Sequence, residues 1–261
     1  MNFSEHITQT LGKDIADKLI KNIEKEPLHC LRINHLKISA SKFCSLINNL
    51  TPHKYVNNAF YFNKDDKLGV HPLHLAGTYY IQDPSAMMVV HLLNPQENEK
   101  IIDLCAAPGG KSSQCLIKMN DKGLLVSNDI SLTRAKNLQF NMERMGLKNS
   151  IVCSQDIASL SKKYHGYFDK VILDAPCSGE GMFRKNDLVY EDWTIEKVNN
   201  LVDIQKDLIL KAYSLLKKDG IMVYSTCTFE TMENEEIIKY LLENSNASLI
   251  NINENCTNYR G

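Results

Sequence analysis

The stretch IIDLCAAPGGKSSQ, residues 101–114, decides the fold of this chain. An apolar run ends in a turn of small residues, Cys105–Lys111, and the next segment, KSSQCLIKM, has the pattern of a helix. Small residues let a backbone approach a ligand closely, and the following helix presents its first amide N–H groups to that ligand. The stretch therefore predicts a strand, a ligand-binding loop and a helix.

The same alternation continues towards the C-terminus. Four further strand-like runs are GLLVSND, SIVCSQD, DKVILDAP and GIMVYSTCT, which begin at residues 123, 150, 169 and 220. Helical segments separate them, including residues 131–146 and 198–220, and each of these two ends at a glycine. Strands and helices that alternate at these lengths predict an α/β fold, a parallel sheet with helices on both faces.

The N-terminal part has a different character. Residues 1–70 mix a helical start with short apolar runs such as LRINHLKIS. We therefore expect a small N-terminal α+β domain over 1–70, followed by a larger domain over 71–261.

Composition limits the function classes. Of 261 residues, 43% are hydrophobic and 23% charged, which is ordinary for a globular protein. No apolar run approaches the roughly 20 residues of a membrane helix, and the first residues lack a secretory pattern, so we expect a cytoplasmic protein without a membrane partner. The eight cysteines form no CxxC pair, which disfavours a zinc site, and we expect no metal.

The net charge of −1 gives no global field that would attract nucleic acid, so RNA binding would need a local basic face. Basic residues do recur in the N-terminal part, and an ordinary solvated surface explains them equally well. They are Lys13, Lys18, Lys21, Lys25, Arg32, Lys37, Lys42 and Lys54.

The loop also excludes two common nucleotide motifs. It lacks the third glycine of GxGxxG, which disfavours NAD and an oxidoreductase, and it lacks the first glycine of GxxxxGK[ST]. A tight turn without a ligand is the alternative. Acidic residues at later strand ends favour a ligand: Asp129 could accept both ribose hydroxyls of an adenosine, and Asp156 the adenine amino group. Asp174 ends the fourth strand, although single acids in turns are often only caps.

Two cysteines follow strand ends at the same predicted sheet edge, Cys177 in DAPCSG and Cys227 in STCT. Most cysteines in cores are inert. A thiol and a carboxyl group beside a sulfonium cofactor suit cytosine, because a thiolate that adds to ring carbon 6 makes carbon 5 nucleophilic. The residues alone leave open which cysteine attacks.

Four motifs in order carry a resemblance to a known family. The segments HPLHLAGTYYIQDPSAM, IDLCAAPGGKSSQ, VILDAPCSGEGMFRK and YSTCTFETMENEE resemble the Nol/Nop/Sun family of RNA cytosine-5 methyltransferases, and bacterial ribosomal RNA members in particular. The resemblance covers most of the chain from about residue 28 and implies a Rossmann-like class I methyltransferase sheet. It also implies that the small N-terminal domain binds RNA.

The resemblance implies roles for matching positions. S-adenosyl-L-methionine would be the cofactor, and Cys227 the nucleophile that forms a covalent adduct with carbon 6. Cys177 would assist release of the product, and Asp174 would also face the target base. Weaker candidates are Lys111, Arg134, Arg184 and Lys185, for which ordinary surface charge is the alternative. The cofactor-binding residues would be Cys105, Ala106, Ala107, Pro108, Gly109, Gly110, Lys111, Asp129, Asp156 and Asp174.

We therefore expect a monomeric enzyme that methylates RNA, with ribosomal RNA as its substrate. A transfer RNA cytosine-5 methyltransferase is one alternative, and a catalytically impaired RNA-binding fragment that acts in ribosome assembly is another. Family members usually continue past the STCT helix into a GDGFF-like segment. This chain stops at residues 258–261, so we expect the last strands to be missing.

Overall fold

The computed structural model of the chain describes residues 2–252, so residues 258–261, where the missing strands were expected, lie outside it. The chain divides into two compact units. The sheet unit comprises Leu28–Leu173 and Ala212–Val223, and the cysteine unit comprises Met1–Pro27, Asp174–Lys211 and Tyr224–Gly261. The predicted domain boundary at residue 70 follows a different division and stays a prediction.

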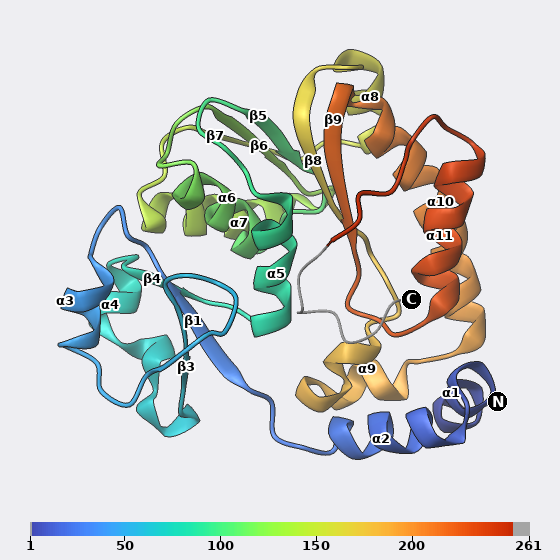
Figure 1. The fold of residues 1–261 in the computed structure, drawn as a ribbon, viewed down its shortest axis with the longest axis horizontal. Helices are drawn as coiled ribbons and strands as arrows, with labels where there is room; N and C mark the ends of the chain where they lie inside the picture. The colour runs from blue at the N-terminus through green and yellow to red at the C-terminus, as the bar shows by residue number, and fades with distance from the viewer. Residues whose placement is uncertain (1, 253–261) are drawn as a thin grey trace. The chain divides into compact units, whose positions relative to one another are not determined.

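The larger sheet has five strands in the order β7-β6-β5-β8-β9 (Figure 1). β5 pairs in parallel with β6 and with β8, and β6 pairs in parallel with β7. The predicted Rossmann-like fold is thereby confirmed. Successive strands are added from β5 through β6 to β7, and the next strand, β8, lies on the other side of β5. Ligands of such sheets bind beyond the strand ends at the point where the order reverses. The strands are β5 Lys100–Asp103, β6 Leu124–Asn128, β7 Ser150–Cys153, β8 Phe168–Asp174 and β9 Leu216–Ser225.

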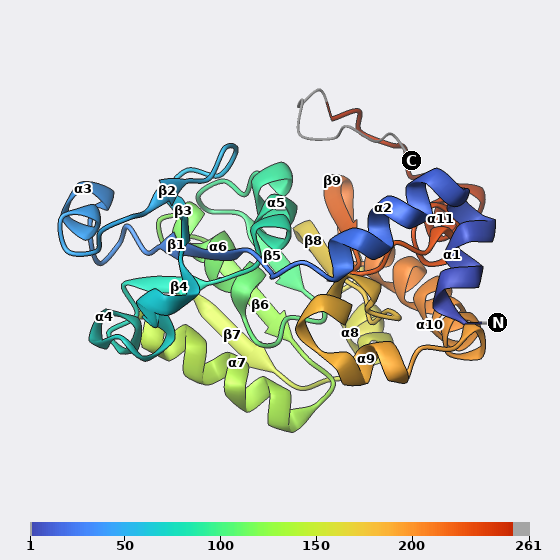
Figure 2. The same ribbon diagram turned by 90° about the horizontal axis from the view of Figure 1, so that it is seen from below.

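Three helices, α5 (Pro84–Leu93), α6 (Gly110–Lys118) and α7 (Leu132–Met145), pack on one face of this sheet. Figure 2 shows α7 running along β7. Their apolar side chains form one buried core with strand residues such as Ile101 and Leu125, both completely buried. This packing fixes the start of α6, and with it the end of the predicted ligand loop.

The helix predicted over 198–220 is wrong at its C-terminal end. Helix α10 spans Ile195–Ser214, and the segment before Gly220 already belongs to β9. The backbone N–H of Gly166 donates to the Ser214 carbonyl at 2.9 Å, and that of Tyr167 to the Leu215 carbonyl at 3.0 Å. These long-range bonds satisfy the carbonyls at the helix end, so the helix stops before its glycine.

A second, four-stranded sheet has the order β2-β3-β1-β4 and belongs to the sheet unit. All three strand pairings are antiparallel. Apolar side chains from it form a separate core around Phe43 and Tyr79, both completely buried. Its strands are β1 His29–Ile33, β2 Thr51–Pro52, β3 Ala59–Phe62 and β4 Tyr79–Ile81, with α3 Ala40–Cys44, η1 Lys64–Asp66, η2 Leu68–Val70 and α4 Pro72–Leu75 in its connections.

Arg32 is one of the recurring basic residues of the N-terminal part, but it belongs neither to a basic face nor to a solvated surface. The residue is only 3% exposed, because β1 turns its side chain towards α6. Its Nη2 donates to the Gly110 carbonyl at 3.2 Å and to Ser113 Oγ at 2.9 Å. A charged side chain in the sequence does not reveal on which side of a strand it lies.

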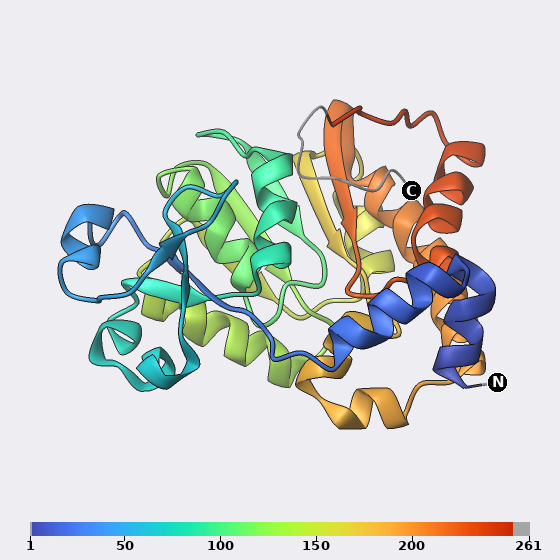
Figure 3. The ribbon, with the colours of Figure 1, turned by 60° about the horizontal axis from the view of Figure 1, so that its bottom comes forward.

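The cysteine unit is mostly helical. Helices α1 (Phe3–Leu11) and α2 (Lys13–Ile23) pack against each other (Figure 3). Phe3 of α1 packs edge-on against the rings of Phe183 and Trp193, with centroid distances of 4.9 and 5.4 Å. The unit's other elements are η3 Glu180–Lys185, α9 Asp187–Glu191, most of α10, η4 Thr231–Glu233 and α11 Glu235–Glu243. Helix α8 Ile157–Lys163 belongs to the sheet unit.

Within residues 2–252, no helix combines the length and the apolar character needed to cross a membrane.

Candidate functional site

The predicted cofactor loop, Cys105–Lys111, connects β5 to α6 in the sheet unit. Gly109 has φ 106°, a left-handed conformation, and a Cβ there would lie 2.9 Å from Leu138 Cδ1 of α7. Only glycine fits both requirements without strain. The Pro108 carbonyl accepts a hydrogen bond from Asn141 Nδ2 at 2.9 Å, which fixes the middle of the loop to α7.

Sequence reasoning missed a buried polar chain below this loop. Ser112 Oγ of α6 donates to Asp103 Oδ2 at the end of β5, at 2.7 Å, and Ser127 Oγ of β6 donates to Ser112 Oγ at 3.0 Å. All three residues are completely buried. The signal in the sequence was Asp103 itself, a carboxylate inside an apolar run. Hydrogen bonds of this kind lock the start of α6 onto two strands.

Asp129 follows β6 and is 1% exposed. Its Oδ1 accepts from the backbone N–H of Ser131 at 3.1 Å. Its Oδ2 is buried and lies 3.2 Å from Arg134 Nη2, but no described residue donates a hydrogen bond to it. Arg134 Nη2 also donates to the Ala107 carbonyl of the loop at 3.1 Å. The structure therefore brings Asp129 and the loop together through Arg134.

Asp156 is differently placed. It is exposed and caps helix α8, where its Oδ2 accepts from the backbone N–H of Ser159 at 3.2 Å. A cap was the alternative explanation for this acid, and the predicted contact with the adenine amino group stays a prediction. Lys111 is half-buried at the start of α6.

Asp174 is the last residue of β8 and begins the middle segment of the cysteine unit. Its Oδ1 accepts from Ser225 Oγ at 2.7 Å, and the Ala175 N–H donates to the Ser225 carbonyl at 2.8 Å. These two bonds join the residues that directly precede the two cysteine segments.

The two predicted cysteines meet. Cys177 Sγ lies 3.3 Å from Cys227 Sγ, and the backbone N–H of Cys227 donates to Cys177 Sγ at 3.3 Å. Ser178 Oγ and Thr228 Oγ1, the next residues of each segment, are 2.8 Å apart. Cys227 is exposed and Cys177 half-buried, so both strand ends contribute a thiol to one place and one of the thiols is open to solvent.

The hydrogen bond with Cys227 and burial raise the pKa of the Cys177 thiol well above its usual range. A raised pKa keeps this thiol protonated at neutral pH, and a protonated thiol is a poor nucleophile. The pair therefore has unequal chemistry: Cys177 holds its proton, and Cys227 is the more exposed sulfur.

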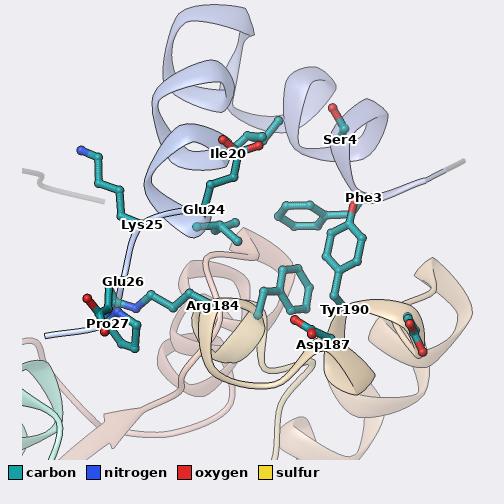
Figure 4. Close-up of a pocket in the computed structure, with 13 residues that line it drawn as sticks. Phe3, Ser4, Ile20, Glu24, Lys25, Glu26, Pro27, Arg184, Asp187 and Tyr190 are labelled. Atoms are coloured by element: carbon teal, nitrogen blue, oxygen red, sulfur yellow. The ribbon is translucent and has the colours of Figure 1, made fainter. Parts of the chain in front are cut away.

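A cavity of about 630 Å³ lies elsewhere in the cysteine unit, between α1, α2, η3 and α9 (Figure 4). Phe3, Ile20 and Tyr190 line it, with the acidic side chains of Glu24 and Asp187 nearby. None of its described lining residues is a catalytic or cofactor-binding prediction. Arg184, one of the weaker candidates, does line it.

The parallel sheet, the small-residue loop after β5 and the acid after β6 define a Rossmann-like protein with a site for a nucleoside-containing ligand beyond its strand ends. The chain belongs to the family described as 16S rRNA methyltransferase RsmB/F, which matches residues 90–259. The N-terminal domain of 16S rRNA methyltransferase RsmF matches residues 1–84. The Nol/Nop/Sun resemblance is thereby confirmed.

Proteins from several bacteria are similar to this chain in sequence. Ribosomal RNA small subunit methyltransferase F of Vibrio campbellii is 37% identical over 236 residues, which cover 87% of this chain and 49% of the relative. The protein of the same name from Psychromonas ingrahamii is 37% identical over 251 residues, covering 92% of this chain and 52% of the relative. The chain thus spans about half the length of these relatives.

Solved structures of other proteins are similar to this chain in fold. A methyltransferase homolog protein from Pyrococcus horikoshii is 29% identical, with a TM-score of 0.83 over 93% of this chain and 78% of the other. NSun6 from Pyrococcus horikoshii, solved with SFG, is 22% identical with a TM-score of 0.85 over 93% of this chain and 87% of the other. The second likeness shows the fold alone.

Proposed function

We propose that this chain transfers a methyl group from S-adenosyl-L-methionine to carbon 5 of a cytosine in ribosomal RNA, through a covalent adduct with Cys227. The observation that carries the proposal is the thiol pair: two cysteines from different strand ends lie 3.3 Å apart, one of them exposed. A protein that only binds RNA needs neither thiol. The names of the bacterial relatives support a ribosomal RNA substrate.

The residues of the sheet unit fit the cofactor. Asp129 Oδ2 is a buried carboxylate oxygen without a hydrogen-bond donor among the described residues, and a ribose hydroxyl would supply one. The close packing of Gly109 against Leu138 of α7 fixes the backbone of the loop that would hold the cofactor. Asp129 and Cys105–Lys111 would hold the cofactor, with Asp156 at its adenine amino group. When bound, S-adenosyl-L-methionine supplies an electrophilic methyl group.

The cysteine unit would carry the covalent chemistry. The Cys227 thiolate adds to ring carbon 6, and the Asp174 carboxyl group supplies a proton to the ring nitrogen, which makes carbon 5 nucleophilic. After methylation, a base takes the proton from carbon 5. The electron pair of that C–H bond re-forms the ring double bond, the Cys227 thiolate leaves, and the ring nitrogen returns its proton to the Asp174 carboxylate. Cys177 assists this last step.

The substrate proposal has two consequences. A target cytosine in a duplex must leave the base stack before Cys227 can reach carbon 6. A ribosomal RNA substrate also implies that the enzyme acts in the cytoplasm, and we propose that it does so as a monomer.

Methyl transfer to a small-subunit ribosomal RNA transcript tests the proposal. With labelled S-adenosyl-L-methionine, the chain should produce 5-methylcytosine, detected after nuclease digestion. Cys227→Ala should produce none. The exposed cysteine of α3 offers a control, and Cys44→Ala should leave the product unchanged. Label in any other nucleoside, or activity in Cys227→Ala, would contradict the proposal.

A further inference from the structure

A buried carboxylate holds the segment that carries Cys177. Glu233, the last residue of η4, is completely buried. Its Oε2 accepts a hydrogen bond from the backbone N–H of Ser178 at 3.0 Å, and its Oε1 lies 3.3 Å from the same nitrogen. The residue after Cys177 is therefore held by both oxygens of one carboxylate.

The residue before Cys177 is held by the same carboxylate through a second side chain. Gln205 of α10 is completely buried, and its Nε2 donates to Glu233 Oε2 and to the Pro176 carbonyl, both at 2.8 Å. Both partners are acceptors, so the amide nitrogen must be the atom that faces them. Glu233 and Gln205 thus fix Cys177 from both sides along the chain.

The same glutamate is tied to the Cys227 strand. The Tyr224 hydroxyl, three residues before Cys227, donates to the Glu233 carbonyl at 2.6 Å. One residue therefore links the two segments whose thiols are 3.3 Å apart.

Packing alone does not explain why a carboxylate occupies position 233. The described partners of the Glu233 side chain are N–H donors rather than cations, so the charge has no ion pair to offset its burial. An ionised carboxylate is acceptor-only and can serve both donors at once. In Glu233→Gln the shape is kept, but one side-chain oxygen becomes an N–H group that faces a donor.

We propose that Glu233 is a positioning residue for the methyl-transfer reaction, which acts with Gln205 to hold Cys177 against Cys227 so that the methylated RNA is released. This inference rests on the proposed function. It predicts that loss of Glu233 slows release and leaves the first attack by Cys227 intact.

The test compares the first turnover with steady-state turnover, using a small-subunit ribosomal RNA transcript and labelled S-adenosyl-L-methionine. In Glu233→Gln, the first turnover should stay within about twofold of the unmodified chain, while steady-state turnover falls about 10- to 100-fold, the scale of a small misplacement of a reacting group. Covalent RNA–protein complex should accumulate on a denaturing gel.

Glu230→Gln is the matched control. Glu230 is also a completely buried carboxylate near η4, but its described partners are His6, Thr231 and the Met232 N–H rather than the Cys177 segment. It should lower the melting temperature without accumulating the complex. Equal losses of first and later turnovers in both variants would show a merely structural role and overturn the inference.

Two further variants keep the inference testable. If Glu233→Gln does not fold, Gln205→Met provides a second test, because it removes the hydrogen bond to the Pro176 carbonyl. This variant should release the methylated RNA slowly as well. Normal release would overturn the inference. In the Cys177→Ala background, Glu233→Gln should change the release rate by less than about twofold, because the two changes act on one step. Additive effects would also overturn it.

The outcomes separate this inference from the proposed function. If Cys227→Ala still methylates the transcript, the proposed function is wrong. If Cys177→Ala forms the complex while Glu233→Gln releases its product normally, only the inference about Glu233 is wrong.

Discussion

Replacing Asp129 by Asn should weaken binding of S-adenosylhomocysteine by about 1.5–3 kcal/mol, the range for hydrogen bonds to a charged group. The side chain of Asp129 is only 2% exposed, so water does not screen its interaction with a ligand hydroxyl. The ion pair between Asp129 and Arg134 contributes little to the free energy, because the Arg134 side chain is 58% exposed. Its loss in Asp129→Asn should therefore change cofactor binding only slightly. The predicted loss of binding free energy corresponds to a roughly 10- to 150-fold higher Kd.

Isothermal titration calorimetry measures this effect directly. The Asn side chain keeps an oxygen for the Ser131 N–H, so the start of α7 should stay folded. Glu143→Gln is a suitable control, because it removes the same charge from an exposed position of α7. An unchanged Kd in Asp129→Asn, or tighter binding of NAD than of S-adenosylhomocysteine by the unmodified chain, would refute the cofactor assignment.

Three further predictions follow from the site. Asp156→Ser keeps a helix cap but withdraws the carboxylate, and should weaken cofactor binding by about 0.5–1.5 kcal/mol; an unchanged Kd would leave this residue as a cap only. Iodoacetamide at about pH 8 should label Cys227 faster than Cys177, because a raised pKa lowers the thiolate fraction of Cys177; peptide mass spectrometry would reveal the opposite order. Gly109→Ala should lower stability in urea by about 1–3 kcal/mol, whereas Gly69→Ala, whose added Cβ would meet only an atom 3.9 Å away, should not.

The sheet could be predicted because its signals are local. Apolar runs, glycine turns and helical patterns each extend over a few residues, and their alternation fixes the class of fold. The end of α10 could not be predicted in this way. The carbonyl of its last residue, Ser214, accepts a hydrogen bond from Gly166, which lies far away in the sequence, and this contact ends the helix before Gly220.

The candidate site shows the same limit. Because both cysteines follow the ends of parallel strands, the sequence predicted that Cys177 and Cys227 would lie at one sheet edge. The 3.3 Å distance between their sulfur atoms, however, depends on the loops that follow the strands. Glu233 and Gln205 gave no signal, because charged and amide side chains near helices are usually exposed. Their burial becomes visible only when the segments of the cysteine unit are seen packed together.

The covalent intermediate is the central claim, and a denaturing gel with labelled RNA tests it most directly. Cys177→Ala, incubated with a small-subunit ribosomal RNA transcript and S-adenosyl-L-methionine, should give a slowly migrating protein–RNA complex that depends on the cofactor. Cys227→Ala and the double variant should give none, because no thiolate remains to attack carbon 6. A complex formed by Cys227→Ala but not by Cys177→Ala would contradict the account and assign the nucleophile to Cys177.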